Sequence, residues 1–147
     1  MTHLRVSHVG ICVSDWKQSL RFYHDVLGFR YVQELELSGE PSSTLLQLED
    51  VDFRALYLER EGVRIELRHY EKPGHTSDPA PRPMNQLGLS HLSLRVEDLD
   101  ALLKDFEKAG VDVLERTRVD VPRANAKAVF ITDPDGTLIE LVQQPGD

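Results

Sequence analysis

The chain has few of the features that mark secreted or membrane-bound proteins. Its single cysteine, Cys12, cannot form an internal disulfide, which is typical of a reducing compartment. No apolar run approaches the roughly 20 residues that a membrane-spanning helix needs. The first residues also lack the basic and apolar pattern of a signal peptide. We therefore expect a cytoplasmic protein.

Basic residues are scarce as well. The chain has 17 Lys and Arg against 25 Asp and Glu, a net charge of −8. Nucleic acid and anionic lipid both require a basic face, so we expect neither as a partner. The sequence also lacks a phosphate-binding loop, a dinucleotide glycine pattern and a nucleophile elbow. The hydrophobic fraction of 40% is ordinary for a globular protein, and 147 residues suffice to bury a core.

An internal repeat organises what is present. Residues 6–17 and 89–100 each have the pattern of a short strand that carries one histidine, then an acidic turn and a helix. His8 aligns with His91 in this repeat. A second match lies later in each half, where Glu66 aligns with Glu140.

Alternation and helical spacing predict the same order of elements in both halves. The first half is expected to contain a helix over 16–26 and strands over 4–13, 29–37, 44–48, 53–59 and 63–70. The second half is expected to contain a helix over 98–109, a tight turn over 133–136 and strands over 91–96, 111–115, 127–132 and 137–143. The pattern assigns no structure to 116–126. We therefore predict an α+β fold of two βαβββ repeats.

A proline-rich segment separates the two repeats. Residues 71–88 hold several prolines and little apolar content, which is typical of an extended linker. The predicted organisation is an N-terminal module over 1–70, this linker, and a C-terminal module over 89–147.

The repeated polar residues are candidate metal ligands. Each interrupts a strand with apolar neighbours, so all four are expected on the faces opposite the core. A single strand histidine or glutamate is more simply a solvated residue. Four at equivalent places favour a site for Zn, Ni, Co, Mn or Fe, which imidazole and carboxylate suit. The predicted metal ligands are His8, Glu66, His91 and Glu140.

Four further residues are expected to line the same cavity and contact a substrate. By alternation, Cys12 follows His8 on its face, and Arg95 follows His91. Arg95 could bind an anionic group, although a solvent-facing arginine at a strand end explains it equally well. Arg54 and Phe130 complete the predicted substrate-binding set.

These motifs resemble the vicinal oxygen chelate superfamily, which includes glyoxalase I, methylmalonyl-CoA epimerase, extradiol dioxygenases and bleomycin-binding proteins. The resemblance covers nearly the whole chain and is carried by the segments 8–15, 22–29, 91–98 and 130–141. It implies two βαβββ modules whose paired, curled mixed sheet surrounds a shared cavity. It also implies that the metal positions fall on the four residues named above.

The full set of two histidines and two glutamates resembles glyoxalase I most. The resemblance implies a metal-dependent lyase or isomerase that acts on a small oxygen-chelating substrate through a metal-stabilised enediolate. Glu140 is then the first choice for the catalytic base and Glu66 its partner, with the reverse assignment open. We also expect a homodimer. The ligands could converge within one chain or across a swapped dimer.

Two alternatives remain at this stage. An Fe(II) extradiol dioxygenase uses two histidines and one glutamate, so Glu66 would be surplus there. A non-catalytic protein that binds a small molecule or antibiotic would not need the metal set. The sequence also offers no convincing site for a thiol cofactor.

Overall fold

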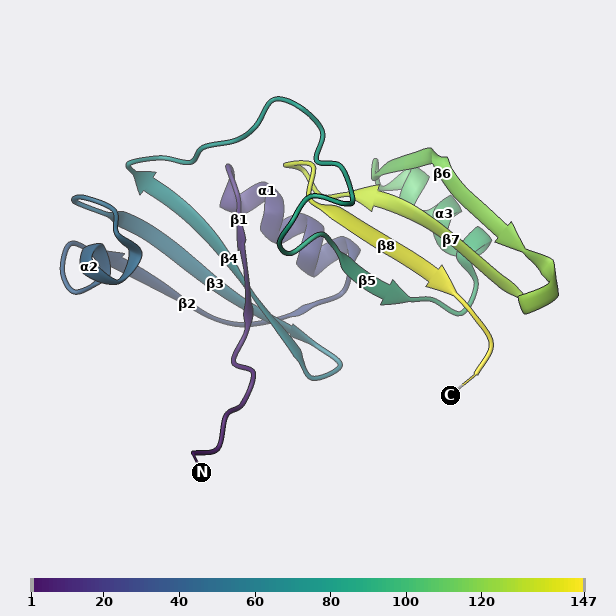
Figure 1. Cartoon of the computed structure of the whole chain (residues 1–147), viewed down its shortest axis with the longest axis horizontal. Coiled ribbons are helices and arrows are strands. Elements are labelled where there is room, and N and C mark those ends of the chain that lie inside the picture. Colours follow the sequence, from purple (N-terminus) through teal and green to yellow (C-terminus); the bar gives the residue numbers. More distant parts are fainter. Residues whose placement is uncertain (1, 147) are drawn as a thin grey trace. The chain divides into compact units, whose positions relative to one another are not determined.

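The computed structural model describes residues 2–146, which form two compact units. The chain divides between Ser77 and Asp78, inside the segment 71–88 that is rich in proline. Each unit holds four strands in one mixed sheet with a helix after its first strand (Figure 1). The α+β fold class of two βαβββ repeats, predicted from the sequence, is confirmed.

The first unit is built on the sheet β1-β4-β3-β2. Its strands are β1 (Val9–Cys12), β2 (Arg30–Ser38), β3 (Asp52–Arg60) and β4 (Val63–Lys72). β1 runs parallel to β4, and the other two pairs are antiparallel. β1 is shorter than predicted because its ladder with β4 begins only where Val9 meets Ile65. Leu4 and Val6 precede that point and are exposed.

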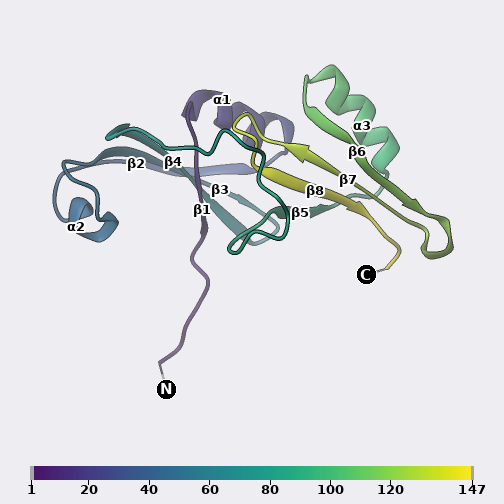
Figure 2. The same ribbon diagram turned by 45° about the horizontal axis from the view of Figure 1, so that its top comes forward.

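A helix covers one face of this sheet. α1 (Trp16–Leu20) is capped by Asp15, whose carboxylate accepts hydrogen bonds from two backbone N–H groups of the first turn. It continues as a π-helical turn over Arg21–Val26, which the spacing did not predict. In this turn the Leu27 amide donates to the Phe22 carbonyl at 2.9 Å. Figure 2 shows α1 on one side of the strands. Phe22, Leu27 and their buried neighbours form the core between helix and sheet.

The strand predicted over residues 44–48 is wrong, because this segment starts within the short helix α2 (Ser42–Leu46). The Glu40 carboxylate accepts hydrogen bonds from the backbone and the hydroxyl of Thr44, which fixes the first turn. A short apolar run does not distinguish strand from helix. Leu46 and Leu48 instead pack against the buried residues Val51, Phe53 and Ala55.

The second unit repeats the topology in the order β5-β8-β7-β6. Its elements are β5 (Leu92–Arg95), α3 (Leu99–Lys108), β6 (Asp112–Val121), a 3-10 turn over Pro122–Ala124, β7 (Ala126–Thr132) and β8 (Leu138–Gln143). The Asp98 side chain caps α3. Leu103 and Phe106 are buried on its inner face, as their helical spacing predicted.

Segment 116–121, left unassigned by the sequence pattern, extends β6 past an irregularity in the ladder. The Thr117 hydroxyl compensates there: it donates to the Leu114 carbonyl and accepts from the Phe130 amide. The tight turn predicted over 133–136 is confirmed, because the Gly136 amide donates to the Asp133 carbonyl at 3.1 Å. Among residues 2–146, no helix combines the length and apolar composition that crossing a bilayer requires.

Candidate functional site: two histidine–glutamate half-sites

Strand register decides which side chains share a face with the candidate ligands. In the first unit Gly10 pairs with Glu66, and Glu66 also pairs with Tyr57 on β3. Alternation then places Glu66 and Tyr57 on the face away from α1, whereas Ile65 and Leu67 point to the helix side. β4 therefore presents the Glu66 carboxylate on one face, because Ile65 and Leu67 pack into the core on the other.

His8 precedes β1 and lies against this group. Its Nε2 is 3.5 Å from Oε2 of Glu66, and its ring meets the Tyr57 ring edge to face at 5.4 Å. The Ser7 hydroxyl lies 2.9 Å from Nδ1 of His8, within hydrogen-bond distance. A partner on Nδ1 fixes the ring and leaves Nε2 for another ligand.

Glu66 is a buried carboxylate with three polar neighbours. Its side chain is only 1% exposed. Oε1 forms an ion pair with Nε of Arg68, while Oε2 faces His8. Burial and a hydrogen bond to Glu66 raise the pKa of the Tyr57 phenol to about 12, so this hydroxyl stays protonated. These contacts compensate for the cost of burying an ionised group.

The donor atoms of this pair fit one divalent ion. Bonds of about 2.1 Å to imidazole nitrogen and carboxylate oxygen put neighbouring donors about 3.0 Å apart at a right angle and about 3.4 Å apart at the tetrahedral angle. The observed separation of 3.5 Å between His8 and Glu66 is close to that spacing. We call His8 and Glu66 the first half-site.

The second unit presents the same residue types at the equivalent places. The Ser90 hydroxyl lies 2.8 Å from Nδ1 of His91, and the His91 ring meets Phe130 edge to face at 5.4 Å. Glu140 pairs in register with Phe130 and with Ser93, whose hydroxyl donates to the Glu140 carboxylate at 2.7 Å. We call His91 and Glu140 the second half-site.

The two carboxylates nevertheless differ in their surroundings. Glu66 is buried and ion-paired, whereas Glu140 is partly exposed and accepts from a neutral hydroxyl. In the register position that Arg68 occupies beside β1, the second unit has Val142 beside β5. The repeat therefore conserves the ligand types but not the groups that hold them. Within residues 2–146, three or more His, Cys, Asp or Glu side chains nowhere converge closely enough to hold a metal.

The predicted substrate-binding residues fall into two groups. Cys12, Arg95 and Phe130 lie on the same faces as the half-sites: Cys12 pairs with Arg68, and Phe130 pairs with Glu140. Arg95 pairs with Val142 and donates to the carbonyl of Gly146 in the C-terminal tail.

Arg54 does not join these residues. It pairs with His69 on the opposite face of the first sheet, because it is an odd number of residues from Tyr57. There its guanidinium lies 4.4 Å from the Trp16 ring centroid and forms ion pairs with Glu34 and Glu36. The packing of Arg54 against α1 accounts for its position, so a substrate contact is not needed to explain it.

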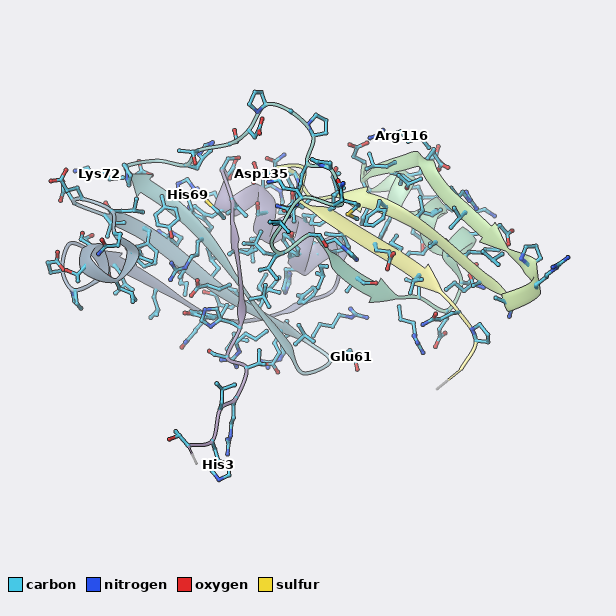
Figure 3. The ribbon with its side chains drawn as sticks, viewed as in Figure 1. His3, Glu61, His69, Lys72, Arg116 and Asp135 are labelled. Atoms are coloured by element: carbon cyan, nitrogen blue, oxygen red, sulfur yellow. The ribbon has the colours of Figure 1, made fainter. Side chains whose placement is uncertain are left out.

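The structure adds four residues, in two groups, to the set predicted from the sequence. Ser7 and Ser90 orient the two histidines. The sequence feature that could have indicated them is the Ser-His dipeptide that occurs in both repeats. Tyr57 and Arg68 hold Glu66: Arg68 lies two residues along the same strand, whereas only strand register reveals the proximity of Tyr57. His3, in contrast, lies on the N-terminal extension away from the strands (Figure 3).

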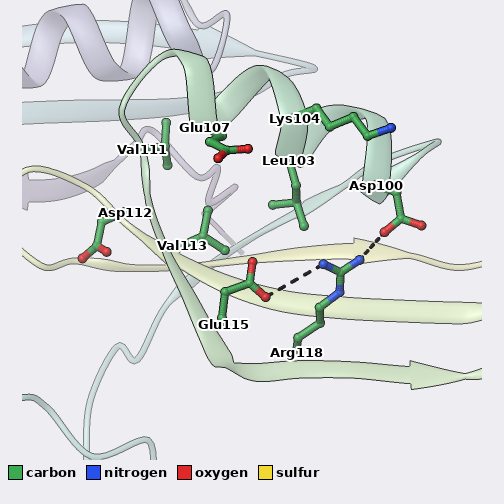
Figure 4. A pocket seen from close by; sticks show the side chains of 9 residues that line it. All are labelled: Asp100, Leu103, Lys104, Glu107, Val111, Asp112, Val113, Glu115 and Arg118. Carbon is green, nitrogen blue, oxygen red and sulfur yellow. Dashed lines mark hydrogen bonds and ion pairs between the residues drawn. The ribbon is translucent and has the colours of Figure 1, made fainter.

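A separate pocket of about 660 Å³ lies between α3 and β6 in the second unit. Figure 4 shows its lining, in which Arg118 bridges Asp100 and Glu115. A hydrogen bond from Lys127 lowers the pKa of Asp100. Neither member of the second half-site lines this pocket. Its guanidinium, that of Arg118, is paired with two of the lining carboxylates.

Comparisons with known proteins agree with this architecture. The family model described as the Glyoxalase/Bleomycin resistance protein/Dioxygenase superfamily matches residues 5–141. The uncharacterized protein YaeR of Escherichia coli is 31% identical over 140 residues, covering 95% of this chain and 96% of that protein. The lactoylglutathione lyase of Pseudomonas aeruginosa is 30% identical over 151 residues, covering 93% and 81%.

The fold is also that of a solved structure. The crystal structure of a glyoxalase family protein from Bacillus cereus matches with a TM-score of 0.84 and 22% identity, covering 99% of this chain and 97% of that one. At this identity the likeness concerns the fold alone. With the family model matching nearly the whole chain, the protein belongs to the Glyoxalase/Bleomycin resistance protein/Dioxygenase superfamily, the vicinal oxygen chelate superfamily that its motifs resemble.

Proposed function

We propose that the chain is a metal-dependent lyase or isomerase that moves a proton between adjacent carbons of a small oxygen-chelating substrate. The observation that carries this proposal is the pairing of His8 Nε2 with Glu66 Oε2 at 3.5 Å, in a repeat that presents the same residue types again. The likeness to a lactoylglutathione lyase at 30% identity supports the same class of reaction.

In this proposal both half-sites together hold one divalent ion of Zn, Ni, Co, Mn or Fe. The four ligands are His8, Glu66, His91 and Glu140. When bound, the metal supplies Lewis acidity toward two neighbouring substrate oxygens. The Ser7 and Ser90 hydroxyls hold the two imidazoles with Nε2 available. The proposal keeps the expectation of a cytoplasmic homodimer.

Glu140 is the proposed base. A group that carries a proton between two carbons needs freedom to move and a protonation state that can change. Glu140 is partly exposed and is held by the single hydroxyl of Ser93. Glu66 is buried between Arg68 and His8, which suits a fixed ligand. Arg95, Cys12 and Phe130 share the half-site faces and are the proposed substrate contacts.

The metal content of protein purified without chelator tests this function. We expect near-stoichiometric metal in the wild type and a loss in the Glu66→Gln and His91→Ala variants. Activity would then be screened with α-hydroxyacyl thioesters, acyl-CoA epimers and catechols. Oxygen uptake with a catechol would instead indicate a dioxygenase. Protein that takes up none of the five metals contradicts the proposal, and tight ligand binding without turnover would then indicate a binding protein.

A further inference from the structure

An arginine that the proposed reaction does not use lies beside the first half-site. Arg68 follows Glu66 by two residues on β4, on the same face of the sheet. Its Nε pairs with Oε1 of Glu66, and its Nη1 donates to the Tyr70 hydroxyl at 3.1 Å. The guanidinium carbon also lies 5.0 Å from the ring centroid of Phe53. Arg68 is therefore held from several sides and is only 24% exposed.

The groups that hold Arg68 belong to a packed cluster. The rings of Phe53 and Tyr70 lie 5.6 Å apart, and Phe53 is buried. Leu46, at the end of α2, and Leu48 pack against the same cluster. A cation over an aromatic face is attracted by the ring, and the attraction strengthens when water is excluded. This packing fixes the guanidinium, which in turn fixes one oxygen of Glu66.

The two oxygens of Glu66 consequently have different roles. Oε1 is occupied by Arg68, and Oε2 is directed to Nε2 of His8 at 3.5 Å. We propose that Arg68 is a positioning residue: it anchors Oε1 of Glu66 so that Oε2 alone is presented beside His8 as a metal ligand. This inference rests on the proposed function.

The second half-site supports this assignment by contrast. There Val142 occupies the register position of Arg68, and Glu140 is held by a serine hydroxyl. An anchored carboxylate is suited to permanent ligation, and a weakly held one is suited to moving a proton. Arg68 therefore makes the two carboxylates of a repeated motif unequal.

Titration with Co²⁺ of otherwise metal-free protein tests the role of Arg68. Removing the partner of a metal ligand typically weakens metal binding about 10–100-fold, and we expect this loss in Arg68→Met. The visible spectrum of bound Co²⁺ should also change, because Glu66 would rotate and its coordination would alter. Arg68→Lys should recover part of the affinity, since it keeps the charge but not the planar fork.

Arg64 offers a matched control on the same strand. It lies two residues before Glu66 on the same face, but its guanidinium pairs with Glu59 at 3.0 Å. Arg64→Met should keep Co²⁺ affinity within about twofold of wild type, because it breaks only a partly exposed pair. Equal affinity and an unchanged spectrum in Arg68→Met would overturn the inference, as would tighter binding.

A second measurement separates misfolding from misplacement. Arg68→Met leaves a buried carboxylate without its counter-charge, so its urea midpoint should fall. Adding Glu66→Gln should restore part of that loss, because a carboxamide needs no counter-charge. If the two substitutions lower the urea midpoint independently and additively, Arg68 and Glu66 are not coupled and the inference is contradicted. Wild-type protein that binds neither Co²⁺ nor any of the other four metals would overturn the proposed function and this inference together, whereas failure of Arg68→Met alone overturns only the inference.

Discussion

At the residue scale, the environment of each carboxylate sets its expected role. Glu66 and Glu140 occupy equivalent places in the repeat, yet the first is buried beside a guanidinium and the second is partly exposed beside a hydroxyl. Identical residue types therefore have different freedom to move. The sequence identifies the pair but does not rank its members, because the burial of each carboxylate and contacts such as Tyr57 beside Glu66 and Ser93 beside Glu140 depend on neighbouring strands.

The proposed division of labour makes a direct prediction. Glu140→Gln should lower kcat by about 10²–10⁴-fold while much of the bound metal remains, because a carboxamide cannot accept the proton. Glu66→Gln should instead act mainly by reducing the metal content of the protein. Turnover rates beside metal analysis of both variants check this. Full activity in Glu140→Gln would refute its role as base.

Tyr57 provides a prediction about alkaline stability. Burial and the hydrogen bond to Glu66 raise the pKa of its phenol to about 12 in the folded protein. The unfolded phenol ionises near pH 10, so its stabilising contribution is complete below that pH and is lost as pH rises toward 12. The free energy of unfolding should fall by about 1–2 kcal/mol over this range. Partial exposure of the phenol keeps this fall below the full value of the pKa difference.

Urea unfolding of wild type and Tyr57→Phe across this pH range measures the difference. The phenylalanine variant should lose less stability between pH 10 and pH 12, because it has no phenol to ionise. Equal losses in the two proteins would show that Tyr57 does not cause the alkaline transition.

At the element scale, spacing predicts long helices and alternating strands well. The apolar residues of α3 recur at the helical period, and Asp98 caps its first turn, so its bounds differ little from the prediction. The predicted strand over 44–48 fails because its five residues form no decisive pattern. Here the side chain of Glu40 and the burial of Leu46 decide the conformation.

The turn before β8 gives a prediction about an element that carries Glu140. The buried Asp133 carboxylate accepts hydrogen bonds from the amides of Asp135 and Thr137 at 2.9 and 2.8 Å. Asp133→Ala leaves both donors without this partner and should lower the unfolding free energy by about 1–3 kcal/mol. Chemical denaturation measures this. Asp105→Ala, on the exposed face of α3, should change stability by less than about 0.5 kcal/mol.

At the scale of the whole molecule, a complementation experiment tests how the proposed half-sites combine. The residues of each half-site belong to one unit. If the proposed site combines half-sites from two chains, inactive variants of different half-sites can complement each other. Co-refolding His8→Ala with His91→Ala should then restore about a quarter of the sites, because half of the dimers are mixed and each has one intact site.

The corresponding control is either variant refolded alone, which should stay inactive. No recovery in the mixture, together with proof by mass spectrometry that mixed dimers form, would place all ligands of a site within one chain. Recovery near the expected fraction would establish a site shared between chains.

The repeat, the fold class and the four candidate ligands could all be predicted from the amino-acid sequence. These follow from local spacing, since alternation assigns a face to each strand residue and two matched histidines and glutamates are visible in one dimension. That Arg54 lies on the helix side and that Tyr57 lies beside Glu66 emerges only from the folded chain. The reason is physical: register between strands distant in sequence sets these contacts, and the packing of whole faces sets the register.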